Sequence, residues 1–454
     1  MPLEDIFRAY DIRGVFNEDL TVDVAAKVGL VFGSYLGGSS RVSVGQDVRT
    51  SSPLLSAAFQ AGVASSGCDV VSVGALPIPL ANFHTWHRKF HNGAYITASH
   101  NPPSYNGIRF RHGDGSGFTH QNETIKTRFF NERMERKAWD RVGKMQTTPS
   151  EEVIDSYVGF LQGKLPHQKP LRIALDPGNG AGGLIAPRLL RDFGHTVSGV
   201  NMAIDGGFPG RGSQPKDGVL QELEAEVRAT KAAFGAAFDG DGDRVVIVDD
   251  QGRTVQTEKL GIILARHLLQ EQRGPVLVNI PCSMIVEEQL EPLGAKVIRT
   301  RVGDVFVCEA LKEHKAVFGM EISAHFFLPQ FYIFDDPFLV TLKLVEVLEE
   351  TGDPLSALVD AIPSYPVIEQ AVNVPDAIKF QVIDDLRELY EGQGERVDLT
   401  DGVKVSRQGG WGLLRCSNTQ PMIRIFAEAH DAATLERLVK EFRQTLQGAI
   451  DRRC

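Results

Sequence analysis

The sequence predicts an α/β protein of several domains, in which helices cover mixed β-sheets. Its 454 residues allow about three or four domains at roughly 100–200 residues each. One pattern recurs in the segments 41–73, 171–200 and 275–302: a β-branched run, a Gly-, Ser- or Pro-rich turn, a helical stretch, a glycine and a second β-branched run. Strand–helix–strand units of this kind build mainly parallel sheets covered by helices. Three spaced copies therefore predict three similar α/β domains.

The chain after residue 363 has a different pattern, which predicts a smaller α+β domain. Residues 363–367, PSYPV, have the composition of a linker. Helical spacing follows over residues 376–393 and 432–450, with β-branched runs between them at 402–417 and 422–430. The predicted domains are residues 1–150, 151–253, 254–363 and 364–454.

Composition limits the classes of partner that the chain can bind. With 48 Lys and Arg against 58 Asp and Glu, the net charge is −10, which disfavours general binding of nucleic acid or of anionic membranes. The N-terminus has no apolar signal region, and no apolar run reaches the roughly 18–20 residues of a spanning helix. Five widely spaced cysteines without a CxxC pattern indicate reduced thiols. We therefore expect a cytoplasmic protein.

A first candidate site is the segment Thr97–Phe110, TASHNPPSYNGIRF, which follows an apolar run and is rich in turn-forming residues. This composition predicts an exposed loop after a strand. Ser99 is its natural nucleophile, although the segment lacks the Gly-x-Ser-x-Gly pattern of an esterase. The alternative is a polar loop that only turns the chain.

A second candidate site is the segment Phe238–Arg244, FDGDGDR, between two apolar runs. Asp239, Asp241 and Asp243 alternate with glycines, so their side chains can converge and offer the hard oxygen ligands that suit Mg²⁺ or Ca²⁺. An EF-hand would need Gly at the sixth loop position and Glu at the twelfth, which this chain lacks. Neighbouring carboxylates repel unless a positive charge joins them. A solvated acidic hairpin neutralised by Arg244 is the alternative to a metal site.

Two further segments carry polar side chains in patterns that suit a ligand. Residues 415–424, RCSNTQPMIR, offer two guanidinium groups, hydroxyls and turn N–H groups, which together suit a phosphate dianion. In residues 319–327, GMEISAHFF, Glu321, Ser323 and His325 alternate, so one face of an extended segment would be polar and could grip sugar hydroxyls. The alternatives are a surface turn with incidental Arg and an edge strand with one wet face.

Two other patterns have simpler explanations. His84, His87 and His91 lie at helical spacing without a Cys or carboxylate partner, so we interpret them as the surface of an amphipathic helix and not as a zinc site. Residues 176–183, DPGNGAGG, are glycine-rich but lack the Gly-Lys-Ser/Thr ending and the GxGxxG spacing. They predict a turn from a strand into a helix.

In this order and combination, the four candidate segments resemble the α-D-phosphohexomutase family, in particular its phosphomannomutase/phosphoglucomutase branch. The resemblance begins at residues 7–14, FRAYDIRG, and extends past Arg424, so it covers nearly the whole chain. TASHNP together with DGDGDR is highly specific. The resemblance implies three similar α/β domains and a fourth, α+β domain around one central cleft.

The resemblance also implies a phosphoenzyme mechanism that depends on Mg²⁺. Phosphorylated Ser99 passes its phosphoryl group to a hexose monophosphate. The resulting hexose 1,6-bisphosphate turns over in the cleft and returns its other phosphoryl group to Ser99. This bisphosphate is both the intermediate and an activator of the enzyme. The implied metal ligands are Ser99, Asp239, Asp241 and Asp243. The implied catalytic residues are Ser99, His100, Arg109, His325 and Arg13, and the implied substrate-binding residues are Tyr10, Arg244, Arg301, Glu321, Ser323, Arg415, Ser417, Asn418, Thr419 and Arg424.

The sequence departs from the family pattern at several positions. Arg109 replaces the usual Lys, a proposed acid/base, and Arg is almost never deprotonated. Either His325 transfers the proton or Arg109 only stabilises charge. Gln420 stands where Glu is common, and Ala324 where Gly is usual. Residues 300–304, TRVGD, are also similar to the phosphoglucosamine mutases, although the chain lacks their Glu-Gln-Ser-Gly-His and Ser-Gly-Thr motifs.

Mannose and glucose phosphates are therefore the expected substrates, and the preference between them stays open. A phosphoglucosamine mutase and a non-catalytic sugar-phosphate-binding protein are the alternatives, and a Ca²⁺-binding protein is a third. The expected partners are small-molecule sugar phosphates, with no nucleic acid and no membrane. The sequence leaves open whether the protein is a monomer or a homodimer.

Overall fold

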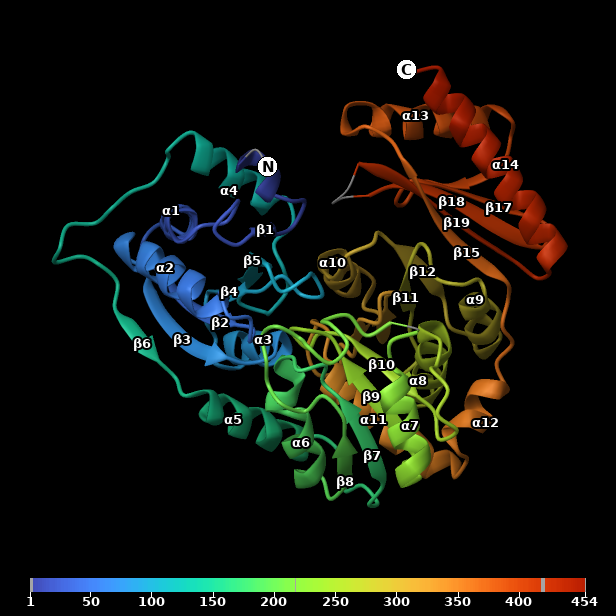
Figure 1. Cartoon of the computed structure of the whole chain (residues 1–454), viewed down its shortest axis with the longest axis horizontal. Helices are drawn as coiled ribbons and strands as arrows, with labels where there is room; N and C mark the ends of the chain where they lie inside the picture. Colours follow the sequence, from blue (N-terminus) through green and yellow to red (C-terminus); the bar gives the residue numbers. More distant parts are fainter. Residues whose placement is uncertain (1–2, 217, 418–420, 454) are drawn as a thin grey trace.

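Four β-sheets, in four successive units, organise the described residues, 3–216, 218–417 and 421–453, in a computed structural model of the chain. Figure 1 shows the units following one another around the molecule, so that the first and the last face each other across the top of the view. None of the described helices is long and apolar enough to cross a membrane. The four described cysteines are free and buried.

Each of the first three units contains one βαβαββ repeat. The first copy comprises β2 (Arg41–Gln46), α2 (Ser52–Ser65), β3 (Asp69–Ala75), α3 (Ile78–His87), β4 (Asn92–Ile96) and β5 (Tyr105–His112). The second comprises β7 (Arg172–Asp176), α6 (Ala186–Asp192), β8 (Thr196–Gly199), α7 (Gln221–Thr230), β9 (Phe234–Phe238) and β10 (Val245–Val248). The third comprises β11 (Val276–Asn279), α9 (Ile285–Leu290), β12 (Val297–Thr300), α10 (Asp304–His314), β13 (Phe318–Met320) and β14 (Phe326–Phe327).

The strands of the three copies are ordered in the same way: β3-β2-β4-β5, β8-β7-β9-β10 and β12-β11-β13-β14. In each copy the first three strands are parallel, and the fourth returns antiparallel beside the third. This shared topology confirms the predicted mixed sheets and the three similar α/β domains.

A glycine ends the helical part of every copy. Gly67, Gly194 and Gly294 precede the second strand of their copies and have φ values of 99°, 92° and 86°. This left-handed conformation favours glycine because a side chain would clash with the backbone. The recurring glycine of the sequence pattern is therefore a helix stop that turns the chain back into the sheet.

The first three units share one continuous core. It joins Tyr95 on β4, Phe238 on β9 and Phe318 on β13 with the helices between them, and all three side chains are at most 1% exposed. The first unit has a further core on the other face of its sheet, where Phe32 stacks on Phe110 and Phe59 packs against both at a tilt. That core is covered by α1 (Val22–Tyr35), α2 and α4 (Gln121–Phe130). Two edge strands, β1 (Ile12–Val15) and β6 (Met145–Thr147), complete its sheet.

The remaining helices of these units connect the sheets or cover them. They are α5 (Ser150–Gln162), α8 (Thr257–Glu271), α11 (Pro337–Thr351) and α12 (Leu355–Asp360). Side chains of α5, α8 and α11 belong to the shared core, so they fix the second and third units against each other and against the first.

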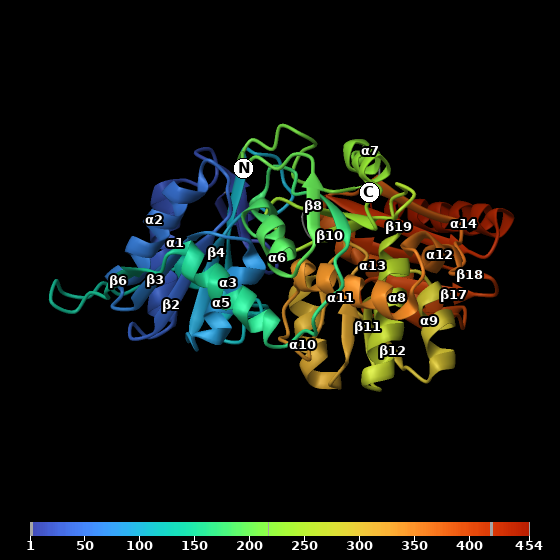
Figure 2. The same ribbon diagram turned by 90° about the horizontal axis from the view of Figure 1, so that it is seen from below.

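The C-terminal unit is an antiparallel sheet with two covering helices, as the α+β prediction requires. Its core contains Val382, Leu414, Ile425 and Phe442, and none of the residues of the shared core. Seen from below (Figure 2), this unit lies beside α8, α9 and α12 and at the opposite end of the molecule from α1 and α2. Its elements are β15 (Val367–Asn373), α13 (Asp376–Gly392), β16 (Arg396–Asp398), β17 (Val403–Arg407), β18 (Gly410–Cys416), β19 (Met422–Ala429) and α14 (Ala432–Asp451).

Candidate active site

The serine, aspartate and glutamate loops occupy the same place in the three repeats. Each connects the third strand to the fourth: residues 97–104 between β4 and β5, 239–244 between β9 and β10, and 321–325 between β13 and β14. The three hairpin loops contact one another. A Cβ atom added to Gly240 would lie 2.7 Å from the Ser99 carbonyl oxygen, and the Val245 N–H donates to the Ala324 carbonyl at 3.2 Å. The repeat thus brings together segments that are far apart in the sequence.

Ser99 is held in a strained and covered position. Its φ of 49° is left-handed, which is uncommon for a residue other than Gly, and its side chain is 3% exposed. The buried Arg49 guanidinium fixes the loop by donating to the carbonyl oxygens of Ser99 at 2.6 Å and Asn101 at 2.7 Å. The Thr97 hydroxyl accepts the Ser99 N–H at 2.8 Å. The sequence predicted an exposed loop; only its tip, residues 102–104, is exposed.

The aspartate loop folds around its own first carboxylate. Asp239 Oδ1 accepts the backbone N–H groups of Gly242, Asp243 and Arg244 at 3.1, 3.1 and 3.2 Å. This tight turn, with Gly242 at a φ of 72°, makes the three carboxylates converge. Oxygen atoms of Asp239, Asp241 and Asp243 all lie within 4.8 Å of one another.

The three converging carboxylates have the properties of a cation site. They are at most 1% exposed, and the Oδ1 atoms of Asp241 and Asp243 have no hydrogen-bond partner among the described residues. Burial, with repulsion from the neighbouring carboxylates, raises the pKa of Asp239 well above its usual range and also raises the pKa of Asp241. A divalent cation would neutralise this repulsion, and these hard oxygen atoms fit Mg²⁺.

The candidate nucleophile lies next to this site. Ser99 Oγ is 3.4 Å from Asp239 Oδ2 and 3.1 Å from His100 Nδ1. The charge of Arg244, followed by burial, lowers the pKa of His100 to about 2, so its ring is neutral. The structure thus brings together four sequence-predicted residues, Ser99, His100, Asp239 and Arg244.

Arg109 connects the aspartate loop to the third repeat. Its Nη1 lies 3.2 Å from Asp243 Oδ2 and its Nη2 lies 2.6 Å from Asp304 Oδ2, and Arg111 reaches the same Asp304 oxygen at 3.2 Å. Burial would lower the pKa of Arg109, but Asp304 and Asp243 raise it well above its usual range. Arg109 therefore keeps its charge and cannot act as the acid/base that a Lys at this position could be.

The glutamate loop is a turn and not the extended segment that the alternation predicted. β13 ends at Met320, and Ala324 has a φ of 72°. Burial raises the pKa of Glu321, whose Oε1 accepts the Asn279 amide at 2.9 Å and the Gly303 N–H at 2.7 Å. Ser323 is half-buried. The alternation in the sequence identified the polar residues correctly, but it did not predict the conformation of their backbone.

His325 lies between Arg244 and two carboxylates. The Arg244 Nε–H donates to His325 Nε2 at 3.0 Å, and Nδ1 contacts Asp335 and lies 3.9 Å from Asp243. The accepting Nε2 means that the ring is neutral in this arrangement, with its proton on Nδ1. Burial opposes a second proton, but Asp243 and Asp335 attract one and raise the pKa of His325 to about 10. The two sets of neighbours therefore favour different protonation states: the neutral ring keeps the contact with Arg244, whereas the protonated ring that Asp243 and Asp335 favour must give up that contact.

The N-terminal residues reach the same region. Arg13 donates to the Asn101 amide oxygen of the serine loop at 3.0 Å and pairs with Asp11 at 2.6 Å. The Tyr10 ring meets the Phe306 ring edge-on at 6.1 Å, and the Arg301 guanidinium lies 4.2 Å from the centre of the Phe306 ring. Burial and the charge of Asp11 raise the pKa of Tyr10 to about 12.

The C-terminal arginines lie on paired strands. Arg415 on β18 and Arg424 on β19 are directly opposite in the antiparallel register, so their side chains share one face. Arg415 is 6% exposed and its Nη2 lies 3.0 Å from Asp401, whereas Arg424 pairs with Glu369 at 2.6 Å. The buried Ser417 lies at the strand end. Asn418, Thr419 and Gln420 lie outside the described residues.

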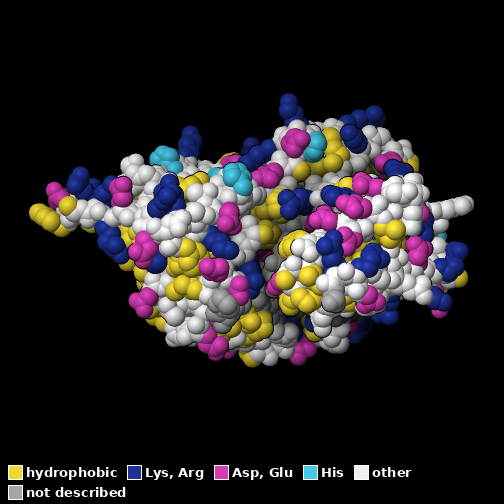
Figure 3. All heavy atoms as spheres, turned by 90° about the horizontal axis from the view of Figure 1, so that it is seen from above, with side chains coloured by type: hydrophobic (Ala, Val, Ile, Leu, Met, Phe, Trp, Pro, Cys, Tyr) yellow, Lys and Arg dark blue, Asp and Glu magenta, His cyan; other side chains and the backbone are white. Residues whose placement is uncertain are grey.

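Backbone contacts connect this arginine face to the glutamate loop. Asp401, the partner of Arg415, accepts the Val302 N–H at 3.1 Å, and the next N–H, of Gly303, donates to Glu321. Seen from the side of α4 and α13, the surface is hollowed between the first unit and the rest of the molecule, with Lys and Arg side chains at the edge of the hollow (Figure 3). These contacts link the C-terminal unit to the glutamate loop, which in turn contacts the aspartate loop.

Several supporting residues were missed by sequence reasoning. They are the partners of the predicted residues, namely the buried Arg49, Asp304 and Asp335 and the half-buried Asp401, together with Asp47, which pairs with Arg49. Asp304 lies in the TRVGD segment, and this similarity was the one available signal. The others have no local pattern, because their partners are distant in the sequence.

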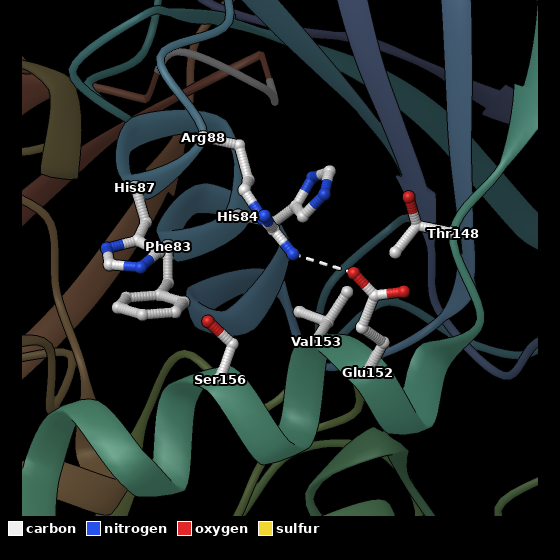
Figure 4. A pocket seen from close by; sticks show the side chains of 8 residues that line it. All are labelled: Phe83, His84, His87, Arg88, Thr148, Glu152, Val153 and Ser156. Carbon is white, nitrogen blue, oxygen red and sulfur yellow. Dashed lines mark hydrogen bonds and ion pairs between the residues drawn. The ribbon is translucent and has the colours of Figure 1, made fainter.

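The three spaced histidines point to separate partners. His84, whose pKa burial lowers to about 4, contacts Ser43 Oγ at 3.0 Å, and His87 stacks on Phe83 at 4.9 Å. His91 Nδ1 accepts the Arg41 N–H at 3.3 Å. Figure 4 shows His84 and His87 in a narrow pocket between α3 and α5, which is crossed by the Arg88–Glu152 ion pair at 2.6 Å. The three histidines have separate partners, and the predicted helix surface holds only for His87: His84 is 4% exposed, and His91 lies beyond the end of α3.

Four family models match successive parts of the chain. Domain I of phosphoglucomutase/phosphomannomutase, described as alpha/beta/alpha, matches residues 4–136, and domains II and III match residues 155–252 and 256–365. The C-terminal domain of the same family matches residues 369–445.

Relatives and a solved structure agree with these matches over almost the full length. The chain is 36% identical to a phosphoglucomutase/phosphomannomutase of Thermococcus kodakarensis, covering 98% of this chain and 99% of that protein. It is 37% identical to a probable phosphoglucosamine mutase of Methanopyrus kandleri, covering 98% of each. A crystal structure of a phosphoglucomutase/phosphomannomutase family protein from Burkholderia thailandensis has a TM-score of 0.90 and 31% identity, covering 98% of each chain. The chain therefore belongs to the phosphoglucomutase/phosphomannomutase family of the α-D-phosphohexomutases.

Proposed function

We propose that the protein interconverts hexose 1-phosphates and hexose 6-phosphates, of mannose or glucose, with Ser99 as the residue that carries the phosphoryl group. The observation that carries this proposal is the placement of Ser99 Oγ 3.4 Å from Asp239, beside buried carboxylate oxygens that have no hydrogen-bond partner among the described residues. A nucleophile next to a cation site is what phosphoryl transfer needs, because positioning and charge stabilisation supply most of the catalysis.

Asp239, Asp241 and Asp243 would hold the Mg²⁺ together with an oxygen on Ser99. When bound, Mg²⁺ supplies charge stabilisation for the phosphoryl group in transfer. Arg109 adds a permanent positive charge on the other side of Asp243. Arg49 and Thr97 hold the Ser99 backbone, so the hydroxyl is placed before the substrate arrives.

The reaction consists of two phosphoryl transfers, first from Ser99 to the substrate and then from the intermediate back to Ser99. The free hydroxyl of the hexose monophosphate attacks the phosphorus on Ser99, the Ser99 O–P bond breaks, and a hexose 1,6-bisphosphate results. After this intermediate turns over, Ser99 attacks the phosphorus of the other phosphate, the bond from that phosphorus to the sugar oxygen breaks, and the sugar oxygen takes a proton as the isomer is released. The attacking hydroxyl loses a proton, and we assign His325 to accept it in the neutral form that also accepts the Arg244 N–H, since Arg109 keeps its charge. Arg415 and the arginine face of the C-terminal unit bind the phosphate that does not react.

A phosphoglucosamine mutase is the second candidate. It is favoured by the 37% identity to the Methanopyrus kandleri protein of that name. A sugar-phosphate-binding protein without catalysis is the third, and the phosphorylation state of Ser99 separates it from the first two. Mass spectrometry of the purified protein should show one phosphoryl group on Ser99 if it is an enzyme of this mechanism.

The deciding experiment is a parallel assay on mannose 1-phosphate, glucose 1-phosphate and glucosamine 1-phosphate with Mg²⁺ and a trace of the matching 1,6-bisphosphate. We expect conversion of the mannose or glucose substrate to its 6-phosphate. Turnover of glucosamine 1-phosphate alone would favour the second candidate. No turnover of any of them, with an unmodified Ser99, would contradict the proposed mechanism.

A further inference from the structure

The glycine-rich segment 176–183, at the end of β7, holds a second irregular segment in place. That segment, residues 201–213, belongs to the connection between β8 and α7 and is called the brace segment below. The Asn179 side chain donates to the Ala203 carbonyl at 2.8 Å and accepts the Gly210 N–H at 3.0 Å. Figure 2 shows the connection extending from β8 towards the first unit before it returns to α7. The brace segment is therefore anchored on the second unit and reaches the first.

Arg211 attaches the brace segment to the start of the aspartate loop. Its guanidinium donates to Asp176 Oδ2 at 2.7 Å, to the Asp176 carbonyl at 2.9 Å and to the Phe238 carbonyl at 2.6 Å. The Arg211 side chain is only 4% exposed, and a Cβ atom added to Gly178 would lie 2.7 Å from its guanidinium carbon. Phe238 directly precedes Asp239, so Arg211 fixes the strand end from which the aspartate loop begins.

Ser213, two residues later, attaches the brace segment to the serine loop of the first unit. Its hydroxyl lies 2.7 Å from the His100 carbonyl and 3.0 Å from the Asn101 carbonyl, so these two acceptors share its single proton. Ser213 is 6% exposed. Arg49, from the first unit, donates to the carbonyls of Ser99 and Asn101. The backbone directly after Ser99 is therefore held from two units, by Arg49 and by Ser213.

The brace segment packs closely against both loops. Phe208 is 3% exposed, and the Arg49 guanidinium carbon lies 5.1 Å from the centre of its ring. A Cβ atom added to Gly240 would lie 2.7 Å from the Ser99 carbonyl oxygen and 3.2 Å from Ser213 Cβ. The serine loop, the aspartate loop and the brace segment therefore meet at Gly240, where no side chain would fit without a shift of the backbone.

These contacts bear on catalysis because they act on both sides of one short distance. Ser99 Oγ lies 3.4 Å from Asp239 Oδ2, and Ser99 has a left-handed φ. A strained residue keeps its conformation only where several surrounding contacts fix it. Ser213 holds the backbone after Ser99, and Arg211 holds the backbone before Asp239. Residues 211–213 thus connect the nucleophile to the cation site independently of the sheets that carry the two loops.

We propose that Ser213 and Arg211 are positioning residues for phosphoryl transfer, which together set the separation between Ser99 and the Asp239 carboxylate. Ser213 acts through the serine loop, and Arg211 acts through the aspartate loop. The kinetic consequence rests on the proposed mutase function, whereas the contacts of the brace segment with the two loops do not.

The first test compares the steady-state kinetics of Ser213→Ala and the wild type with excess Mg²⁺. Misplacement of reacting groups by about 1 Å can cost about 10²-fold in rate, so we expect kcat to fall about 10–100-fold. KM should change less than about twofold, because the described contacts of Ser213 do not include the glutamate loop or the arginine face. The melting temperature should fall by at most about 2–4 °C, as for the loss of one hydrogen bond.

Ser150→Ala is the matched control, because the Ser150 hydroxyl also donates to a distant carbonyl, that of Val73 at 2.8 Å, but at the start of α5. Its kcat should match the wild type. A kcat of Ser213→Ala within about twofold of the wild type would overturn the proposal, and so would an equal fall in Ser150→Ala. Arg211→Lys, which keeps the charge but loses the paired donors, should also lower kcat. Ser213→Ala keeps the proposal testable if this buried variant fails to fold.

Hydrogen exchange followed by mass spectrometry tests the brace segment without any turnover. Peptides that cover residues 97–106 should exchange faster in Ser213→Ala than in the wild type and in Ser150→Ala, while peptides that cover residues 321–325 should not. Unchanged exchange of residues 97–106 in Ser213→Ala would overturn the proposal whatever the activity. A wild type that converts no sugar phosphate, with faster exchange of this loop in Ser213→Ala, would contradict the proposed function and support the positioning of the loop by Ser213.

Discussion

The first three units and the C-terminal unit are held in different ways. The first three share one apolar core that runs from Val73 to Ile362. The C-terminal unit has its own core and meets the third unit through a small apolar cluster formed by Ile280, Trp411, Leu413 and Phe426. Several polar contacts add to this cluster: Glu428 accepts from the Ser283 hydroxyl and the Met284 N–H, Lys404 donates to the Ile280 carbonyl, and Asp401 accepts the Val302 N–H.

This difference in anchoring means that the two parts of the site are held with different rigidity. Ser99, the aspartates and Arg109 are fixed by buried contacts within a shared core, so their relative positions should change little during turnover. The arginine face rests on a small interface and can adjust to a substrate. Changes at the first part should lower kcat, and changes at the second part should raise KM.

The largest effect is expected for Ser99→Ala. Without the nucleophile, kcat should fall at least about 10³-fold, because the covalent step is lost. The melting temperature should stay close to that of the wild type, since the Arg49 contacts are to backbone oxygens. Ser104→Ala, in the exposed part of the same loop, is the matched control and should keep full activity. Comparable turnover in Ser99→Ala would show that the fixed part of the site does not contain the nucleophile.

A smaller loss is expected for Asp241→Asn, which removes one charge from the cation site. We expect Mg²⁺ to raise the melting temperature of the wild type, because it offsets the repulsion among the buried carboxylates. The variant should lose this response, and its kcat should fall about 10²-fold. Asp140→Asn, at an exposed position, controls for the change in charge. A variant with an unchanged Mg²⁺ response would place the metal elsewhere.

Arg415→Gln tests the adjustable part of the site. Loss of a charged hydrogen bond of about 1.5–3 kcal/mol should raise KM about 10–100-fold and change kcat much less. Steady-state kinetics on both the 1-phosphate and the 6-phosphate should show this, because in the proposed mechanism one arginine face binds either end of the sugar. Arg443→Gln, exposed on α14, is the control. A fall in kcat without a change in KM would place Arg415 with the fixed part.

The smallest effect concerns the interface of the C-terminal unit. Lys404 is buried, donates to the Ile280 carbonyl at 2.9 Å and lies 3.8 Å from the Trp411 ring. Burial, followed by the charge of Arg299, lowers the pKa of Lys404 to about 7 and outweighs the attraction of the ring for a cation. The unfolded chain binds this proton up to the ordinary value of 10.5, so stability should increase as pH rises from 7 towards 10.

Denaturant unfolding followed by tryptophan fluorescence can measure this dependence. Between pH 7 and 9, Lys404 should add about 2 kcal/mol to the free energy of unfolding. Lys404→Met should remove this part of the pH dependence, while Lys440→Met on α14 should not. Identical pH profiles for the wild type and Lys404→Met would show that burial at this interface does not lower the pKa of Lys404.

Much of the fold was predictable from local patterns. The β-branched runs and the glycines at 67, 194 and 294 marked three strand–helix–strand units, and the structure has parallel strand pairs at each. The fourth strand of every repeat was not predicted. β14 is two residues long, too short to show a period. The domain boundaries at 150, 253 and 363 stay a prediction.

The site residues were predictable where several functional side chains lie close together in one segment of the sequence. The three aspartates needed no partner to be recognised, because their spacing alone makes them converge. The turn of residues 321–325 was mistaken for an extended segment, since alternation does not report the left-handed Ala324. Arg49 and Asp304 act through partners such as Ser99 and Arg109 that lie far away in the chain, which no local pattern contains.

The hairpin position of the three loops has a consequence for variation in substrate preference. Each loop is anchored at both ends by paired strands, so its residues can be replaced without changing the register of the sheet. The segment 321–325 contacts the other two loops through few backbone hydrogen bonds, such as that from Val245 to Ala324. Grafting residues 321–324 from a relative with another sugar preference, with His325 kept in place, should therefore transfer that preference and leave the chemistry at Ser99 in place.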